Sequence, residues 1–447
     1  METIELLALV AAVLFCLAVL RRSTSPAVQV VRDPAVAHHL LNEVPDNKPN
    51  AGLFRALATW ARGPGRQESI TTAAYGTHWR SLRSNLTAGF LNPSRIAALA
   101  PLQRDAVEDL FAGLSASQGA GEVAIREHLD RAIFALAARM CFGDGMEEKR
   151  VRALQCVMEE LRRAMDNTVS LDDSTLGKIT HWRWLRRLLG VFVPLDELVR
   201  PLIAAARARN DSRHTAYMDL LVDLRVPSTD GGAKRALDDD EILGLVAEFM
   251  ATNTGMIAAC VEWTLANLVI QPEVQRKLRH EVDDEAAAGR ILLSAEQEKR
   301  MPYMRAVVLE SLRMHPPSPF VTRGVHDVTT GGLRKRFIFI LRDIGRHGSA
   351  WTEPDRFRTE RFLPGGEAEE VGHMPGRSGV RMMPFGGGRR FCPGAGLAIL
   401  HVKIFLVALV RRFELSCGGA VDLTGVGGFN NVMKKPLRVR LTPRTLP

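Results

Sequence analysis

Residues 385–394 read Phe-Gly-Gly-Gly-Arg-Arg-Phe-Cys-Pro-Gly, and a helix is predicted directly after them, from Ala395 to Phe413. Cys392 therefore stands at a helix N-terminus, where unsatisfied N–H groups and the positive end of the helix dipole favour a thiolate. Pro393 suits the first turn of such a helix because its missing N–H costs nothing there. The glycines permit φ > 0 and let the backbone approach a flat ligand closely. Three interpretations are open for this stretch: a reactive thiolate, a buried structural cysteine, or a phosphate-cradling loop, although a phosphate loop would end in Gly-Lys-Ser/Thr.

The same stretch resembles the haem-binding signature of the cytochrome P-450 family, Phe-x-x-Gly-x-Arg-x-Cys-x-Gly. Its five fixed positions are met by Phe385, Gly388, Arg390, Cys392 and Gly394. The resemblance implies that the cofactor is haem b and that Cys392 is the axial thiolate of its iron, a ligand that favours O–O cleavage. It also implies that Arg390 pairs with a haem propionate, a charge-assisted contact that suits a guanidinium.

A second motif, Trp79 and Arg83, resembles the Trp-x-x-x-Arg motif of the same family. Residues four apart share one helix face, where an indole N–H and a guanidinium can clamp a carboxylate. Taken alone, the pair also fits an amphipathic helix with a solvated arginine. Together with Cys392, a propionate clamp is favoured. Arg323 and His326 are further candidates for a propionate contact, although neither aligns cleanly with a family position.

Glu310 and Arg313 form a Glu-x-x-Arg pair just before His-Pro-Pro, and Arg361 follows in a Pro-Asp-Arg-Phe-Arg-Thr-Glu-Arg-Phe run. The spacing itself is common along this chain, and a solvated i,i+3 pair is the simpler interpretation. The family context implies instead that the three side chains form a buried ion-pair triad beneath the haem. Such a role is structural, because losing one partner would leave an uncompensated buried charge.

A long helix is predicted over residues 239–270, and at 1.5 Å per residue it would span about 48 Å. In the resembled family this helix passes over the haem, with the core pattern Ala/Gly-Gly-x-Asp/Glu-Thr-Thr. The aligned residues here are Thr252, Asn253, Thr254, Gly255 and Met256. The acid is therefore replaced by Gly255 and the alcohol by Met256, and neither can relay protons to dioxygen as the family's pair does. Asn253 and Thr254 point to other helix faces, from which they could hold a water.

The amino-acid composition limits the classes to which the protein can belong. The chain has 447 residues, of which 46% are hydrophobic and 24% charged, as in a globular protein with a sizeable core. Its net charge is +9, but no basic block is interleaved with aromatics, so nucleic acid is not an expected partner. An anionic membrane face or an acidic protein fits this charge better. The six cysteines lack paired spacing, which favours a reducing compartment over disulfides or zinc.

The N-terminus carries an apolar run, Ile4 to Leu20, that only Glu5 interrupts and that two arginines follow at once. Seventeen residues is about the minimum for a membrane-spanning helix. A cleaved signal peptide would carry positive charge before the run, and here Glu2 precedes it. We therefore expect residues 1–22 to form a single-pass signal anchor, with residues 23–447 cytosolic. A cleaved peptide and a buried helix are the alternatives.

The resemblance extends over nearly the whole chain and implies a mainly α fold with small β-sheets. Residues 23–447 would form one large helical domain around the haem, with its N-terminal part shortened. Residues 381–385 and 433–437 resemble the plant microsomal branch most closely, which implies the endoplasmic reticulum membrane as location. Residues 429–435 and 437–441 resemble the two strands of the family's closing hairpin.

The implied function is a haem-thiolate monooxygenase with Cys392 as the catalytic ligand. It would insert one oxygen atom from O2 into a small lipophilic substrate, with electrons from an NADPH-dependent reductase in the same membrane. The replacements at Gly255 and Met256 leave two alternatives: a haem-binding protein with impaired oxygenase activity, or a haem-thiolate isomerase or dehydratase. The substrate itself is not encoded in a pattern that can be read.

Overall fold

The computed structural model describes the greater part of the chain, and all structural statements below refer to these ranges. They are residues 27–43, 69–117, 121–165, 182–209, 216–228, 232–288, 300–326, 333–376 and 379–445. The predicted signal anchor, residues 1–22, lies outside them.

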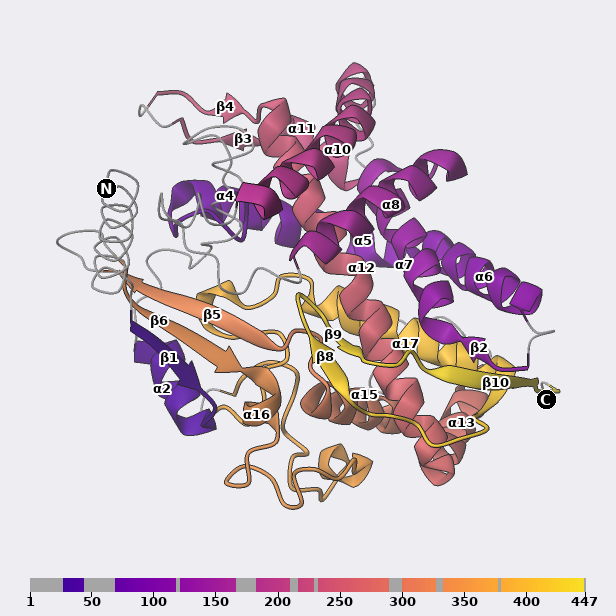
Figure 1. Ribbon diagram of the computed structural model, residues 1–447. Coiled ribbons are helices and arrows are strands. Elements are labelled where there is room, and N and C mark those ends of the chain that lie inside the picture. Colours follow the sequence, from indigo (N-terminus) through magenta and orange to yellow (C-terminus); the bar gives the residue numbers. More distant parts are fainter. Residues whose placement is uncertain are drawn as a thin grey trace, which may run out of the picture.

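Helices form most of the described structure, and short strands form small sheets around them (Figure 1). The helices are α2 (Pro34–Glu43), α4 (Thr77–Ser84), α5 (Pro93–Ala98), α6 (Ala100–Ser117), α7 (Ile125–Phe142), α8 (Glu148–Met165), α10 (Trp182–Ala208), α11 (Tyr217–Asp223), α12 (Asp239–Ile270), α13 (Pro272–Ala287), α15 (Pro302–Met314), α16 (Leu341–Gly345) and α17 (Ala395–Arg412). The strands are β1 (Ala27–Val31), β2 (Val123–Ala124), β3 (Arg225–Val226), β4 (Arg235–Ala236), β5 (Phe320–His326), β6 (Leu333–Ile340), β7 (Phe413–Ser416), β8 (Gly425–Gly427), β9 (Asn431–Met433) and β10 (Arg438–Pro443). The predicted class, mainly α with small sheets, is confirmed.

Helix α12 runs through the middle of the molecule and has the bounds that the sequence predicts. A capping box starts it: Glu241 N–H donates to Asp238 Oδ1 at 2.8 Å, and Asp238 N–H donates to Glu241 Oε2 at 2.9 Å. Pro272 begins the next helix, so α12 ends just before it. In the described part of the chain, α12 is the helix whose length and apolar composition would suffice to cross a membrane, yet here it forms the core.

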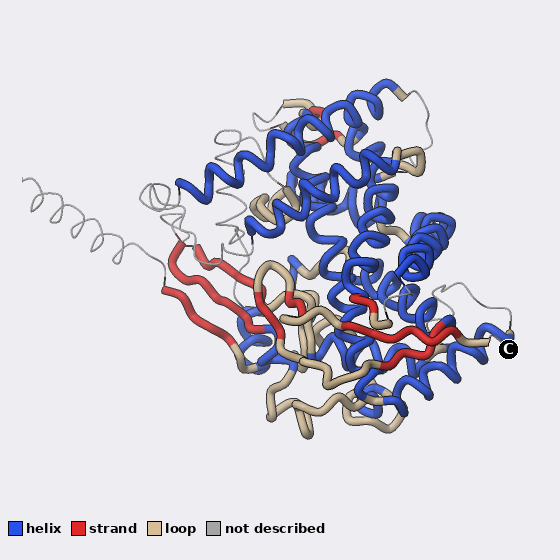
Figure 2. Tube along the Cα trace, turned by 45° about the vertical axis from the view of Figure 1, so that its right-hand side comes forward, coloured by secondary structure: helices blue, strands red, loops and turns tan. Residues whose placement is uncertain are grey.

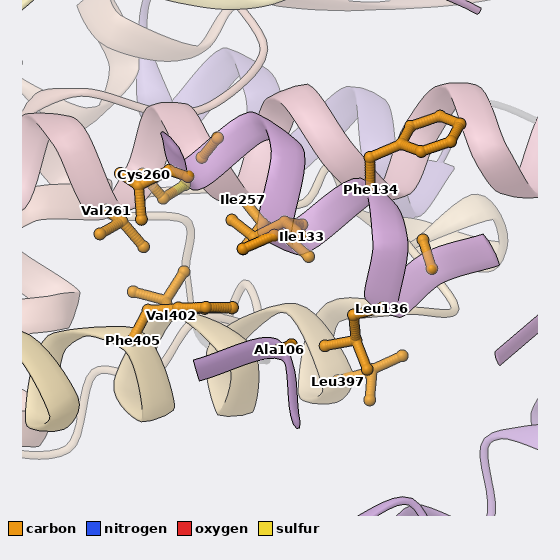
Figure 3. Packing of buried hydrophobic residues seen from close by; sticks show 14 of the residues in the cluster. Ala106, Ile133, Phe134, Leu136, Ile257, Cys260, Val261, Leu397, Val402 and Phe405 are labelled. Atoms are coloured by element: carbon orange, nitrogen blue, oxygen red, sulfur yellow. The ribbon is translucent and has the colours of Figure 1, made fainter. Parts of the chain in front are cut away.

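The core lies where α12 meets α7 and α17. Figure 3 shows Ile257 of α12, Ile133 of α7 and Val402 of α17 directed into this shared interior, where none is more than 3% exposed. Full burial of an aliphatic side chain stabilises a fold by about 1.5–3 kcal/mol. Because α12 is covered by helices along much of its length, nearly all its faces can be apolar.

A three-stranded sheet, β1-β6-β5, lies to one side of the helices (Figures 1 and 2). Strand β1 pairs with β6 in parallel, with Val30 opposite Ile338, and β5 pairs with β6 antiparallel, with Thr322 opposite Ile338. Helix α2 follows β1 and packs against this sheet through Ala37 and Leu40. The sheet and α2 together form one wall of the cavity described below.

The C-terminal strands differ from the sequence prediction. Residues 429–435 and 437–441 do not pair with each other: β9 pairs with β8, whereas β10 pairs with β2 and β7. Strand β8 reads Gly-Val-Gly, and glycine has little strand propensity, so no local pattern marks it as the partner. Pro436 separates β9 from β10 and lets the chain change sheets.

Candidate functional site

The loop before α17 holds Cys392 in a tight, glycine-dependent turn. Gly386 and Gly388 have φ of 74° and 67°, the left-handed region in which a side chain is strained. Cys392 N–H donates to the carbonyl of Phe385 at 3.1 Å, which closes the turn. A Cβ at Gly387 would lie 2.8 Å from Leu41 Cδ1, so the loop also packs closely against α2. The backbone thus presents Cys392 just ahead of the first turn of α17.

A cavity of about 560 Å³ opens beside this loop, within the usual range of about 300–1,000 Å³ for small-molecule sites. All six residues that the sequence predicts to bind the cofactor line this cavity. They are Cys392, Arg390, Trp79, Arg83, Phe385 and Gly394. They come from α4 and from the loop before α17, which are some three hundred residues apart in the chain.

Trp79 and the two arginines form one cationic corner of the cavity. Trp79 Nε1 donates to the carbonyl of Ile70 at 3.0 Å, and Arg390 Nη2 donates to that of Ala73 at 2.8 Å. The guanidinium carbons of Arg83 and Arg390 each lie 5.3 Å from the centre of the indole ring. Burial and the nearby Arg390 lower the pKa of Arg83, while Cys392 opposes them. Positive charge is thus concentrated in a partly buried place, which suits acid groups of a ligand.

The surroundings of Cys392 have opposing effects on the pKa of its thiol. Burial raises the pKa of its thiol, whereas the Gly394 N–H and the Arg83 guanidinium lower it. The helix-terminus effect that the sequence predicts is therefore outweighed by desolvation. A coordinated metal ion deprotonates such a thiol outright, so this donor suits a metal-bearing ligand.

The central part of α12 forms the wall of the cavity opposite the loop. Thr252, Asn253 and Met256 line the cavity, whereas Thr254 and Gly255 do not. Successive helix residues are turned by about 100°, so the five positions cannot share one face. The Thr252 hydroxyl donates to the carbonyl of Glu248 at 2.8 Å and is therefore engaged with its own helix. Met256 thus places an apolar thioether at the position that the resemblance assigns to an alcohol.

Glu248 is a site residue that the sequence reasoning did not single out. Its carboxylate lines the cavity and accepts hydrogen bonds from Thr71 N–H at 2.7 Å, Ile70 N–H at 3.0 Å and the Ser69 hydroxyl at 3.2 Å. Burial raises the pKa of Glu248, and these donors lower it. The residue ties the segment that receives the Trp79 and Arg390 hydrogen bonds to α12. A single acid within an otherwise apolar helix segment was the signal for it.

Glu310, Arg313 and Arg361 meet in the interior, away from the cavity lining. Arg313 donates to Glu310 through Nε at 2.6 Å and through Nη2 at 2.8 Å, and Arg361 Nε lies 3.3 Å from Glu310 Oε1. None of the three is more than 2% exposed. The cluster joins α15 to the segment around Arg361, and none of its three residues lines the cavity, which fits a structural role.

Arg323 on β5 lines the cavity and donates through Nη1 to the carbonyl of Leu40 at 2.8 Å. The side chain of His326 lies outside what the structure describes, so that part of the prediction is not tested.

A larger hollow of about 1080 Å³ lies elsewhere, between α10, α11 and the start of α12. No cysteine lines it, and three of its arginines pair with aspartates at 2.6–2.7 Å. These pairs are Arg200 with Asp240, Arg207 with Asp239, and Arg209 with Asp219. Its charges are largely satisfied internally, so we assign the functional site to the smaller cavity with the thiol.

The fold and this cavity define a class of protein: a large, mainly helical domain whose cavity brings one cysteine thiol together with an indole and two guanidiniums. Within the described residues no group of three or more His, Cys, Asp or Glu side chains could hold a metal by itself.

Comparison with known proteins agrees with this class. The cytochrome P450 family model matches residues 20–442. Cytochrome P450 89A9 of Arabidopsis thaliana is 32% identical over 437 residues, which cover 93% of this chain and 84% of the relative. Cytochrome P450 98A2 of Glycine max is 27% identical over 449 residues, which cover 93% and 83%. A retinoic-acid-bound cyanobacterial structure, CYP120A1, has a TM-score of 0.74 at 20% identity and covers 93% of this chain and 89% of its own, which supports the fold.

The chain belongs to the cytochrome P450 family. Members of the family are in general haem-thiolate monooxygenases that receive electrons from a redox partner and act on lipophilic substrates. The sequence prediction of this family is confirmed. The residues present fit a haem: the thiol suits its iron, the cationic corner suits its acid groups, and the remaining lining is mostly apolar.

Proposed function

We propose that this chain is a haem-thiolate monooxygenase that binds haem b in the 560 Å³ cavity, with Cys392 as the axial ligand. It would insert one oxygen atom from O2 into a small lipophilic substrate, with electrons from NADPH through a membrane-bound reductase. The observation that carries the proposal is the position of Cys392 in one cavity with Trp79, Arg83 and Arg390. Once bound, the haem supplies the activation of oxygen.

The chain's own residues would hold and orient the cofactor. Trp79, Arg83 and Arg390 offer N–H donors to the two propionates, and the backbone carbonyls that now receive these donors lie next to them. Glu248 keeps this cationic corner in place by holding the residue 69–71 segment. Apolar residues of α12, with Met256 among them, exclude water from the side where substrate would lie.

The side of the cavity formed by α12 favours a second candidate function. Proton delivery during oxygen activation needs a titratable group and a hydroxyl, and neither Gly255 nor Met256 provides one. A haem-thiolate isomerase or dehydratase rearranges an already oxygenated substrate and does not need that relay. A haem-binding protein with impaired oxygenase activity would also be without this proton relay. Conversion of an organic hydroperoxide without NADPH would favour the isomerase or dehydratase.

The reduced carbon monoxide difference spectrum tests the ligand assignment. We expect the native protein to give the band of a thiolate-ligated haem and Cys392→Ala to lose it. Cys260→Ala is the matched control, because Cys260 also lines the cavity but burial raises its pKa to about 12. A thiolate band that survives in Cys392→Ala, or that disappears in Cys260→Ala, would overturn the assignment.

We also propose that the protein resides in the endoplasmic reticulum membrane, with its described domain on the cytosolic side. The support is the apolar run of residues 4–20 followed by two arginines, together with the similarity to plant cytochromes P450.

A further inference from the structure

Asn430 stands in the turn between β8 and β9, where its amide packs against α12. The residue is 3% exposed, and the two other residues of the turn, Gly428 and Phe429, line the cavity. On α12 the amide meets Gly255: a Cβ built there would lie far inside van der Waals contact with Asn430 Nδ2. The next nearest atoms to that Cβ are Asn430 Cγ at 3.7 Å and Arg162 Cδ at 3.8 Å. The amide thus occupies the space into which a side chain at position 255 would extend.

Packing, rather than hydrogen bonding of its oxygen, holds this amide. Asn430 Oδ1 is buried and has no hydrogen-bond partner among the described residues. A buried acceptor without a partner is costly, so the shape of the amide, and not a hydrogen bond of its oxygen, is what fits this place. The place of the amide is set by the absence of a side chain at Gly255.

The remainder of the hairpin is fixed from the other end. Asn431 Nδ2 donates to the carbonyl of Pro316 at 3.0 Å, and Asn431 N–H donates to that of Pro317 at 2.8 Å. Trp263 Nε1 donates to the carbonyl of Asn431 at 2.9 Å. These bonds anchor the start of β9, while the contact between Asn430 and Gly255 brings the turn with Phe429 up to the middle of α12 (Figure 1).

We propose that Asn430 is a positioning residue that sets where Phe429 lies in the cavity. The Asn430 amide can take its place because Gly255 has no side chain there. Position 255 of α12 carries an acid in the resembled pattern. In this chain it instead makes room for the turn of residues 428–430, on the side of the cavity where substrate would lie. The loss of the acid and the presence of Asn430 are one linked feature. This inference rests on the proposed function only in taking the cavity as the site of haem and substrate.

Two azole probes of the haem-loaded protein test the proposal by optical titration. 4-Phenylimidazole carries a phenyl ring that can reach the turn, whereas imidazole binds the iron without one. We expect Asn430→Ala and Gly255→Ala each to raise the Kd of 4-phenylimidazole about tenfold, and that of imidazole by less than about twofold. The double variant should raise the Kd of 4-phenylimidazole no more than either single substitution does, because the first substitution already removes the contact between the two residues.

Gly244→Ala is the matched control. Gly244 lies in the same helix, and a Cβ there meets nothing within 4 Å, so both Kd values should be unchanged. The proposal is overturned if the effects of the two substitutions at 255 and 430 add, if 4-phenylimidazole binding is unaffected, or if imidazole weakens as much as 4-phenylimidazole.

A folding defect would also be informative. If Gly255→Ala fails to load haem, Gly255→Ala/Asn430→Ala should recover loading, because alanine at 430 vacates the space; failure to recover contradicts the proposal. Thermal melting of the haem-free variants measures the coupling between positions 255 and 430 without using the thiolate band. A failure of this inference can therefore be told apart from a failure of the proposed haem-thiolate function. Gly255→Asp should likewise be tolerated better with Asn430→Ala than alone.

Discussion

Asp130 lies on α7 among charged side chains that pull its ionisation in opposite directions. Burial raises the pKa of Asp130 to about 7, and Glu159 and Glu262 add to this effect, whereas Arg162 and Arg126 oppose it. Glu262 is fully buried, whereas Asp130 is partly buried, and Glu262 has a partner in Arg126 at 2.6 Å. Burial raises the pKa of Glu262 as well, and Arg126 and the Leu437 N–H lower it.

Asp130→Asn should stabilise the protein, and more so at pH 8 than at pH 5. An unfolded aspartate ionises near pH 4, so between about pH 4 and 7 the folded protein binds a proton that the unfolded chain has lost. The free energy of unfolding therefore falls as pH rises through this window, by an amount of the order of a few kcal/mol. Asparagine removes that dependence. Melting temperatures of both proteins at the two pH values measure it.

Glu127→Gln on the exposed face of the same helix is the control for Asp130→Asn, and it should leave the pH dependence of melting unchanged. If Asp130→Asn raises the melting temperature equally at pH 5 and pH 8, ionisation of Asp130 is not the cause.

At the scale of elements, a buried ion-pair cluster joins α15 to the segment around Arg361. Glu310 accepts from Arg313, from Arg361 and from the Arg358 N–H at 2.7 Å, so one carboxylate holds residues 358–361 against α15. Arg313 also donates to the carbonyl of Gly345 at 2.9 Å, which adds α16 to the same cluster. The elements here are joined by charge as well as by apolar packing.

Glu310→Gln should lower the free energy of unfolding by about 3–5 kcal/mol, because the buried Arg313 would lose its carboxylate partner and Arg361 would keep only Glu367. Chemical denaturation followed by circular dichroism measures the loss. Glu273→Gln provides the control: Glu273 and Arg276 have the same spacing, but their side chains are 74% and 63% exposed. That change should have no measurable effect, and equal losses in the two variants would contradict the prediction.

Helix α12 presents Met256 to the cavity, and its substitution separates the two candidate functions. If the protein is an oxygenase limited by its missing hydroxyl, Met256→Thr should raise product and lower peroxide release per NADPH consumed. Assays with the reductase measure both quantities. Thr254→Ala, which changes a hydroxyl outside the cavity lining, should leave the ratio unchanged. An unaltered ratio in Met256→Thr would count against the oxygenase and for the isomerase or dehydratase.

At the scale of the whole molecule, the cavity is assembled from parts of the chain that lie far apart. Its lining residues run from Leu41 in α2 to Phe429 in the β8–β9 turn, with α4, α12 and β5 between them. The helices and the β1-β6-β5 sheet therefore need to be in place before the cavity has its shape (Figure 2). The net charge of +9 suits association with an acidic partner or an anionic surface.

Deletion of residues 1–22 should move the protein from the membrane pellet to the supernatant after a high-salt wash, because the apolar run from Ile4 to Leu20 would be gone. Replacement of Arg21 and Arg22 by glutamate is the control, since it keeps that run and alters only the charge that sets orientation. Cell fractionation and immunoblotting provide the measurement. A truncated chain that stays in the pellet would show that another surface binds the membrane.

Short-range patterns in the sequence predicted much of the local structure of this protein. The bounds of α12 follow from its acidic start and the proline after its end, and the helix after the signature is α17. Gly386 and Gly388 take the positive φ that the glycine-rich stretch suggested, and all six predicted cofactor residues line one cavity. The helix bounds and the glycine conformations depend on capping, periodicity and backbone freedom within a few residues, so the sequence by itself determined them. The six cofactor residues were identified by their resemblance to the family motifs, and the tertiary structure brings their two segments together.

Other features were decided only by the tertiary structure. Asn430 reaches Gly255, Glu248 receives the N–H groups of residues 70 and 71, and β10 pairs with β2 and β7 rather than with β9. Each of these contacts joins residues that are far apart in the chain, and no short-range periodicity encodes them. They arise when packing chooses among partners of similar local propensity, which is a property of the folded chain and not of any segment.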